Sequence, residues 1–231
     1  MENAETFTED TLLDGRVYFV EDRAPHPKTV ATGRLVGQTG TDQYLVALEL
    51  DTGNKVWEKQ VDFRKLARTF YVSARDDVIV VTGTSDGYHA FAFDANDASQ
   101  LWQHHHPWEK DHHGGAMQHP VLVGDKVLLE RKALDLRTGK VVRSDVPSRR
   151  GCGTMSASAR ATFFRDYSHG MWDVETGDRK DWQGIRSGCW LSIIPAGGLM
   201  LAPESSSGCS CSDPIQTSVA FRPISLGASD G

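Results

Sequence analysis

Short runs of apolar residues, with polar residues between them, recur along the whole chain. Residues 44–50 carry Tyr44, Val46, Leu48 and Leu50 at every second position. Alternation with a period of two is typical of β-strands that bury one face. No stretch shows a convincing helical period of 3.6 residues, so we expect an all-β protein. Further largely apolar runs lie at 17–20, 78–81, 127–129, 162–164 and 199–201.

A turn motif follows these runs at nearly constant spacing. Asp51, Asp94, Asp135 and Asp173 each end an apolar run, and they lie 43, 41 and 38 residues apart. An Asp side chain accepts hydrogen bonds from backbone N–H groups two residues on, and a following Gly supplies the positive φ that closes such a turn. With the strands upstream of each Asp, one period holds about four strands. A four-stranded sheet repeated every ~40–45 residues is the pattern of a β-propeller blade.

The repeats divide the chain into about five units. We therefore predict a β-propeller of four-stranded antiparallel blades, with a lead-in at 1–13 and a tail at 224–231. A β-sandwich with coincidental turns is the alternative, and the near-constant spacing argues against it. The predicted blades are residues 14–60, 66–103, 115–143, 150–183 and 187–223.

The turns resemble a known repeat. Residues 133–139 read Ala-Leu-Asp-Leu-Arg-Thr-Gly, which is similar to the pyrroloquinoline-quinone-like (PQQ-like) repeat. The resemblance covers roughly residues 14–223. The Gly-Cys-Gly-Thr, Gly-Cys-Trp and Gly-Cys-Ser-Cys series at 151–154, 188–190 and 208–211 resemble uncharacterised secreted proteins of this class. Members commonly have seven or eight blades, so five units favour part of a larger propeller; a small closed propeller and pairing with another chain are the alternatives. Open sheet edges would then favour self-association.

Charge and hydropathy exclude some functions. The chain has a formal net charge of −6 and no obvious basic patch, so we expect no nucleic-acid binding. No apolar stretch of 18 residues occurs, so no transmembrane segment is expected. Residues 1–10 are polar and acidic, unlike a secretory signal. Together with the resemblance, this leads us to expect a periplasmic or extracellular protein whose signal sequence lies upstream of this fragment.

The resemblance implies PQQ as a cofactor, but the cysteines argue against it. Quinoprotein dehydrogenases place a disulfide between adjacent cysteines over the quinone ring. Here the nearest pair, Cys209 and Cys211, is separated by Ser210. We therefore expect no bound PQQ.

The four cysteines lie in the last two predicted units. Disulfides in an oxidising compartment are the simplest interpretation, and four cysteines allow three pairings. Alignment of the inner strands places Cys152 and Cys189 at equivalent positions of consecutive blades, which favours that pair. A bond between Cys209 and Cys211 would close a strained small ring. The alternative is a metal or redox site, because thiolates also bind zinc and copper.

A histidine-rich segment follows the second unit. Imidazole is the commonest transition-metal ligand, and the turn at 114–115 could bring His113 and His119 onto one ion. The strand alignment places Met117 at the position of the two blade cysteines. We predict a copper or zinc site from His112, His113 and His119, with Cys152 and Cys189 as further candidates; a solvated polar rim is the alternative. The six histidines of the segment are His104, His105, His106, His112, His113 and His119.

Two other residue types recur with the repeat. Arg150, Arg165 and Arg186 lie near the starts of units and are expected to form salt bridges between blades. The repeated tryptophans are expected in the core between sheets. They are Trp57, Trp102 and Trp182.

Two functions are consistent with these features. The first is a non-catalytic module that binds a protein or polymeric ligand on one rim of the propeller, as an assembly scaffold. The second is a periplasmic metal-dependent or redox enzyme domain that uses the histidine-rich segment. We identify no catalytic residues, and the repeat itself indicates fold far better than function.

Overall fold

The computed structural model describes residues 6–7, 11–23, 42–64, 66, 70–84, 86–107, 119–189, 191–204 and 216–223. In this part of the chain the regular structure is antiparallel β-sheet, and no helix is long and apolar enough to cross a membrane. The chain divides into two compact units. The first comprises Met1–Lys110 and Gly114–Arg143, and the second Asp111–His113 and Ser144–Gly231.

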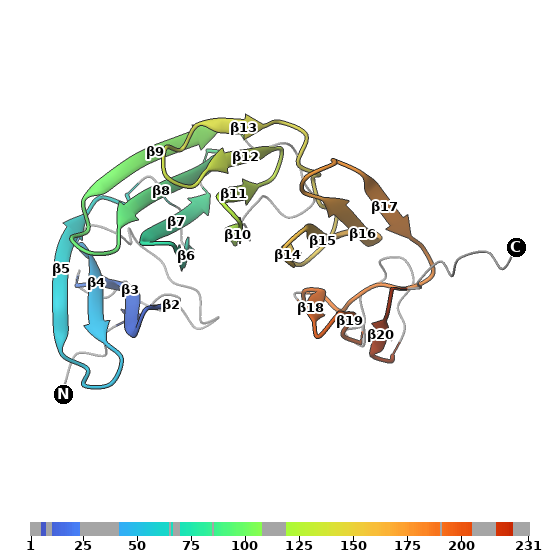
Figure 1. Ribbon diagram of the computed structural model, residues 1–231, viewed down its shortest axis with the longest axis horizontal. Coiled ribbons are helices and arrows are strands. Elements are labelled where there is room, and N and C mark those ends of the chain that lie inside the picture. Colours follow the sequence, from blue (N-terminus) through green and yellow to red (C-terminus); the bar gives the residue numbers. More distant parts are fainter. Residues whose placement is uncertain are drawn as a thin grey trace, which may run out of the picture. The chain divides into compact units, whose positions relative to one another are not determined.

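The first unit contains three sheets, and in the second and third of them the strands follow chain order (Figure 1). The first sheet has β1 (Thr6–Phe7), β2 (Thr11–Leu13), β3 (Arg16–Asp22), β4 (Gln43–Glu49) and β5 (Lys55–Val61). The second has β6 (Phe70–Arg75), β7 (Val78–Thr84), β8 (Tyr88–Asp94) and β9 (Gln100–His106). The third has β10 (Val121–Val123), β11 (Lys126–Leu129), β12 (Lys132–Asp135) and β13 (Val141–Arg143).

The second unit contains two sheets, which Figure 1 draws in yellow to red. The fourth sheet of the chain has β14 (Ser156–Ala157), β15 (Ala161–Asp166), β16 (Ser168–Asp173) and β17 (Arg179–Trp182). The fifth has β18 (Ile194–Ala196), β19 (Leu199–Ala202) and β20 (Val219–Phe221).

The sheets confirm the all-β prediction, and three of the five have four strands. In the first sheet β1 and β2 both pair with β3, one after the other along its length. Together they take the place that a single first strand has in the other sheets. Both strands precede residue 14, where the first predicted blade was expected to begin. The fifth sheet shows three strands among the described residues.

The turn after the third strand has the same geometry in the first four sheets. A backbone N–H four residues on donates to the carbonyl of the last strand residue, as Gly139 does to Asp135 at 2.9 Å. The donor residue always has a positive φ. Glycine supplies it in three sheets, whereas Ala98 adopts a φ of 56° in the second. The donors and acceptors are Gly53 and Glu49, Ala98 and Asp94, Gly139 and Asp135, and Gly177 and Asp173.

Glu49 of the first sheet is therefore equivalent to Asp94 of the second. The sequence-based assignment of Asp51 as the turn residue of the first sheet was wrong. The Thr52 hydroxyl lies 2.7 Å from the Glu49 carboxylate, as the Thr138 hydroxyl does from Asp135. A longer carboxylate side chain thus fills the same capping role. The true motif is an acidic residue, two variable residues, a polar residue and a residue of positive φ.

Tryptophans on the outer strands connect the sheets of the first unit. The indole N–H of Trp57 donates to the carbonyl of Ala95 at 3.1 Å, and that of Trp102 to the carbonyl of Leu136 at 2.8 Å. Each acceptor directly follows the acidic turn residue of the next sheet. Two apolar clusters fill the spaces around these bonds. One includes Tyr18, Leu45, Phe63, Ile79, Phe91 and Phe93, and the other Val78, Val80, Trp102, Val127, Leu129 and Leu134.

A β-bulge sets the register of these tryptophans. In the first two sheets one extra residue on the outer strand places Trp57 opposite Ala47 and Trp102 opposite Ala92. The fourth sheet pairs β16 with β17 in continuous register, so Lys180 lies opposite Met171 and Trp182 opposite His169. Trp182 therefore does not occupy the position of the other two tryptophans, contrary to its assignment to the repeat.

The packing of Trp102 gives a stability prediction. A Cβ added at Gly139 would lie 2.6 Å from the Trp102 ring, and Gly139 has a φ of +66°. A Cβ added at Gly124, which has a φ of +57°, would have no atom within 4 Å. We expect Gly124→Ala to lower the free energy of unfolding by about 1–2 kcal/mol through backbone strain alone. Gly139→Ala should cost about 1–3 kcal/mol more through overpacking.

Denaturant unfolding of the two variants measures this difference. Equal losses in both variants would show that Trp102 does not pack closely against the turn.

Candidate functional site

A groove of about 830 Å³ lies between the two sheets of the second unit. Its lining is mainly apolar, and the largest side chains come from both sheets. On the fourth sheet they are Phe163, Met171 and Trp182, and on the fifth Leu199, Met200 and Phe221. Exposed apolar surface gathered in a groove is the usual mark of a binding site in a soluble domain.

The register of β17 explains why the groove is open. Lys180 lies opposite Met171, which is two residues before the acidic turn residue Asp173. The first two sheets place Trp57 and Trp102 at the equivalent position. An ammonium group at the end of a flexible chain keeps its charge in water, so it cannot fill this space as an indole does. The space between the sheets therefore stays accessible, and Trp182 becomes part of its wall.

The groove carries positive charge. Lys180 and Arg222 line it and are exposed, and no acidic residue lines it in the part of the chain that the structure describes. Strand β20 also borders the groove through Phe221. Among the described residues β20 pairs with β19 alone, so within this part of the chain the backbone N–H and C=O groups of its other edge have no strand partner.

A buried imidazole lies beside the groove. His169 is 1% exposed, and its ring lies 6.3 Å from that of Phe221 in an edge-to-face arrangement. Neither ring nitrogen has a hydrogen-bond partner among the described residues. Burial, with a smaller contribution from the charge of Arg165, lowers the pKa of His169 to about 4. The imidazole is therefore neutral at physiological pH.

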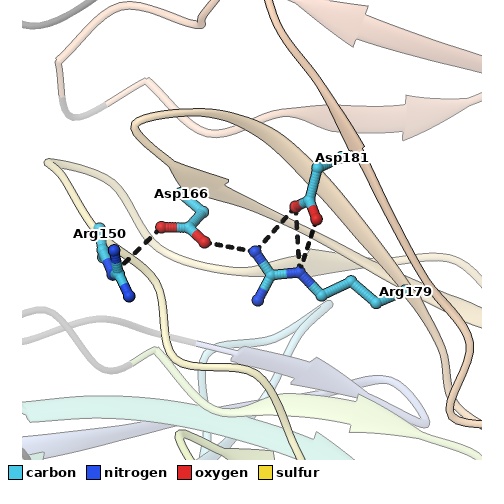
Figure 2. A network of polar contacts seen from close by, with 4 residues as sticks. All are labelled: Arg150, Asp166, Arg179 and Asp181. Atoms are coloured by element: carbon cyan, nitrogen blue, oxygen red, sulfur yellow. Dashed lines mark hydrogen bonds and ion pairs between the residues drawn. The ribbon is translucent and has the colours of Figure 1, made fainter.

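An ion-pair network lies on the face of the fourth sheet that points away from the groove, because Arg179 and Asp181 alternate along β17 with the groove residues Lys180 and Trp182. Asp166 at the end of β15 pairs with Arg150 and with Arg179 of β17, and Arg179 also binds Asp181 (Figure 2). The Arg150 Nε to Asp166 Oδ1 distance is 3.4 Å, and the Arg179 Nη2 to Asp181 Oδ1 distance is 2.8 Å. Arg150 thus forms its ion pair with a strand of the sheet it precedes, and the expected salt bridge between blades was wrong for this residue.

The other two arginines contact the cysteine-containing turns. Arg165 donates from Nη1 to the carbonyl of Cys152 at 2.9 Å. The Nη1 of Arg186 lies 3.9 Å from the Sγ of Cys189 and 3.2 Å from the carbonyl of Ser187. Both arginines are buried, so they hold the turns that lead into the two sheets.

The structure does not contain the Cys152–Cys189 disulfide that the strand alignment favoured. Cys152 is buried and Cys189 is half-buried, with its sulfur near the Arg186 guanidinium. Cys209 and Cys211 lie outside the described residues. The pairing of the four cysteines therefore stays a prediction.

Most of the predicted metal site also lies outside the described residues, namely His112, His113 and Met117. His119 is described, and its ring lies 4.9 Å from that of Tyr71 on the inner strand β6. Cys152 and Cys189 belong to the other unit. The predicted copper or zinc site formed by these residues is thus not tested.

His104 and His106 share one face of β9. The Nε2 of His104 lies 3.1 Å from the Nδ1 of His106, and the Nε2 of His106 lies 3.0 Å from the carbonyl of Glu130. The hydroxyl of Tyr88 donates to the Glu130 carboxylate at 2.5 Å. Burial lowers the pKa of His106 to about 4 and also lowers that of His104. These histidines pack toward the third sheet as neutral groups.

His105 points to the other face, where it meets two residues that the sequence analysis missed. His89 lies directly opposite His105 in the β8–β9 hairpin, and their rings are 4.4 Å apart. The Oδ1 of Asp86 lies 2.7 Å from the Nε2 of His89 and 3.5 Å from that of His105. The signal was available in the sequence, because pairing residues 88–94 with 100–106 as a hairpin brings the two histidines together.

Comparison with known proteins matches most of the chain to one family. Residues 9–220 match the family model described as outer membrane protein assembly factor BamB. No curated protein sequence matches the chain. The solved structure of BamB from Moraxella catarrhalis is similar, with a TM-score of 0.59 and 18% identity, over 96% of this chain and 60% of that one.

WD40 propellers are similar as well. The Pan2 WD40 domain of Neurospora crassa gives a TM-score of 0.55 at 10% identity, over 92% of this chain and 60% of that one. The RRP9 WD40 repeats give 0.56 at 9% identity, over 87% and 58%. The structural likenesses confirm the β-propeller fold, and the family match over residues 9–220 confirms the PQQ-like repeat. This chain spans about 60% of the length of the BamB structure.

The buried histidines His106 and His169 lead us to predict how the free energy of unfolding of each unit depends on pH. An unfolded histidine titrates near pH 6.5, whereas His106 and His169 titrate near 4 in the folded chain. The unfolded state therefore takes up protons first on acidification. The contribution of each histidine to the free energy of unfolding should be intact above pH 6.5, fall between 6.5 and about 4, and level off below, with a loss of at most about 3 kcal/mol for each histidine.

Denaturant unfolding across this pH range, followed for each unit, measures the loss. His106→Gln should flatten the pH dependence of the first unit, and His169→Leu that of the second. An unchanged pH dependence in either variant would contradict the assignment for that histidine.

Proposed function

Because the chain belongs to the family of the outer membrane protein assembly factor BamB, we propose that it is a non-catalytic scaffold that binds an extended segment of a partner protein. The groove between the sheets of the second unit is the binding site. The family description also supports a role in protein assembly outside the cytoplasm, in the periplasm or at the cell surface.

The observation that carries this proposal is the apolar groove beside the edge of β20. An extended segment can pair with an exposed strand edge through its backbone, while alternate side chains enter apolar pockets. The groove offers Phe163, Met171 and Leu199 to such side chains. Lys180 and Arg222 favour a segment that also carries carboxylates.

The groove is suited to moderate affinity. Two or three large apolar side chains contribute about 1.5–3 kcal/mol each when fully buried. Ordering the segment and losing its translational freedom offset much of this gain. We therefore expect dissociation constants in the micromolar range, with weakening by salt because part of the attraction is electrostatic.

Fluorescein-labelled ten-residue peptides test the proposal by anisotropy. The probe alternates Leu or Phe with polar residues and includes two Glu, and the comparison peptide carries Lys in place of Glu. We expect the acidic peptide to bind and the basic peptide to bind at least about tenfold more weakly.

Two aspartate variants locate the site. Leu199 lines the groove and Ile194 does not, although both are exposed residues of the fifth sheet. Leu199→Asp should abolish peptide binding, whereas Ile194→Asp should leave it within about twofold, because a charge is unfavourable only where the apolar segment lies. Equal effects of the two variants, or no binding of the acidic peptide to the parent chain, would contradict the groove as the site.

A third variant tests the cause of the groove. Lys180→Trp restores the side chain that fills the equivalent space in the first two sheets. It should block the peptide while raising or preserving the melting temperature, because the indole buries apolar surface. Unimpaired binding by a folded Lys180→Trp variant would show that this position does not control access.

A further inference from the structure

The histidine pair on the β8–β9 hairpin belongs to the first unit, and it includes none of the groove residues and none of the predicted metal ligands. We propose that Asp86, His89 and His105 form a Zn²⁺ site. The Nε2 atoms of the two histidines and a carboxylate oxygen of Asp86 all lie within 4.8 Å of one another. This site goes beyond the proposed scaffold function and does not depend on it.

The hairpin register builds the site. His89 and His105 are directly opposed across β8 and β9, so their Cβ atoms start from adjacent positions on the same face of the sheet. Their rings are tilted by only 31° and present both Nε2 atoms to the same oxygen of Asp86. Three ligand atoms thus converge without any change of backbone.

The distances are close to those of a tetrahedral zinc site. Zinc lies about 2.0–2.2 Å from nitrogen and oxygen ligands, which places tetrahedral ligand atoms roughly 3.4 Å apart. The His105 Nε2 to Asp86 Oδ1 distance of 3.5 Å already matches. The His89 Nε2 to Asp86 Oδ1 distance of 2.7 Å must widen, and the exposed Asp86 side chain can make that movement.

A glycine makes room for this convergence. A Cβ added at Gly87 would lie 2.6 Å from the Nε2 of His105 and 2.5 Å from the carbonyl of His106. A larger residue would push the Asp86 turn away from the His105 ring. The close approach of turn and strand is therefore a property of this sequence and holds the carboxylate beside both imidazoles.

The donor set and its exposure select the metal. Two imidazoles and a carboxylate suit Zn²⁺, and the absence of sulfur from the trio disfavours Cu⁺. The His89 side chain is 5% exposed and fixes one ligand in the sheet, whereas Asp86 is 75% exposed and His105 is 40% exposed. The fourth position therefore opens to solvent and takes a water molecule.

Zinc titration of the full chain without an affinity tag, followed calorimetrically, tests the site. The informative variants are Asp86→Asn and His105→Ala, because both side chains are accessible and their replacement leaves the core intact. We expect each to lose one equivalent of zinc or to bind it at least about tenfold more weakly. His104→Ala is the matched control, since His104 lies on the same strand but on its opposite face.

A second control separates this site from the histidines and cysteines of the sequence prediction. The double variant His112→Ala/His113→Ala should keep the zinc equivalent that His105→Ala loses. Cobalt substitution should give visible bands without the near-ultraviolet thiolate-to-cobalt band of cysteine ligation. Unchanged zinc binding in both Asp86→Asn and His105→Ala would overturn the proposal, as would no zinc binding by the parent chain.

Discussion

The indole of an outer-strand tryptophan holds each of the first two sheets to the sheet that follows. Its N–H donates to a turn carbonyl of the next sheet, Trp57 to Ala95 and Trp102 to Leu136, while its ring packs among the apolar residues between the sheets. The bond depends on two local features. A β-bulge puts the tryptophan in register, and the acidic turn with its residue of positive φ presents the carbonyl. Stacked repeats gain much of their stability from such interfaces between neighbours.

The candidate binding groove follows from the loss of this arrangement in the fourth sheet. Here Lys180 takes the tryptophan position, and Trp182 lies two pairs further along β17. A charged, flexible side chain leaves the space between two sheets open to solvent, and the surrounding apolar residues become a groove instead of a core. The loss of the arrangement that stabilises the first unit therefore explains the position of the groove in the second unit. The ion pairs of Asp166 with Arg150 and Arg179 lie within one sheet and leave this space unaffected.

The sequence predicted the repeated antiparallel sheets, because apolar alternation and turn residues are local signals. It misassigned the first turn, since Asp51-Thr-Gly resembles the motif although Glu49 performs the capping role. It also misplaced Trp182, which lies five residues after Gly177, whereas Trp57 and Trp102 lie four residues after Gly53 and Ala98. The continuous pairing of β16 and β17 puts Lys180 opposite Met171 instead, and the sequence does not show which outer strands carry a bulge. The cluster of Asp86, His89 and His105 could be found only by pairing the strands of the hairpin. Asp86 and His89 precede the histidine-rich segment in the chain and meet His105 only across β8 and β9. Spacing of like residues drew attention to His112, His113 and His119 instead.

Hydrogen exchange of the indole N–H groups tests the inter-sheet arrangement most directly. In a ¹⁵N-tryptophan sample the Trp57 and Trp102 indole protons should exchange slowly, because both are bonded to carbonyls of the next sheet. The Trp182 indole, in the wall of an open groove, should exchange much faster. Slow exchange of Trp182, similar to that of Trp102, would contradict the account, since it would show that the space between the last two sheets is closed.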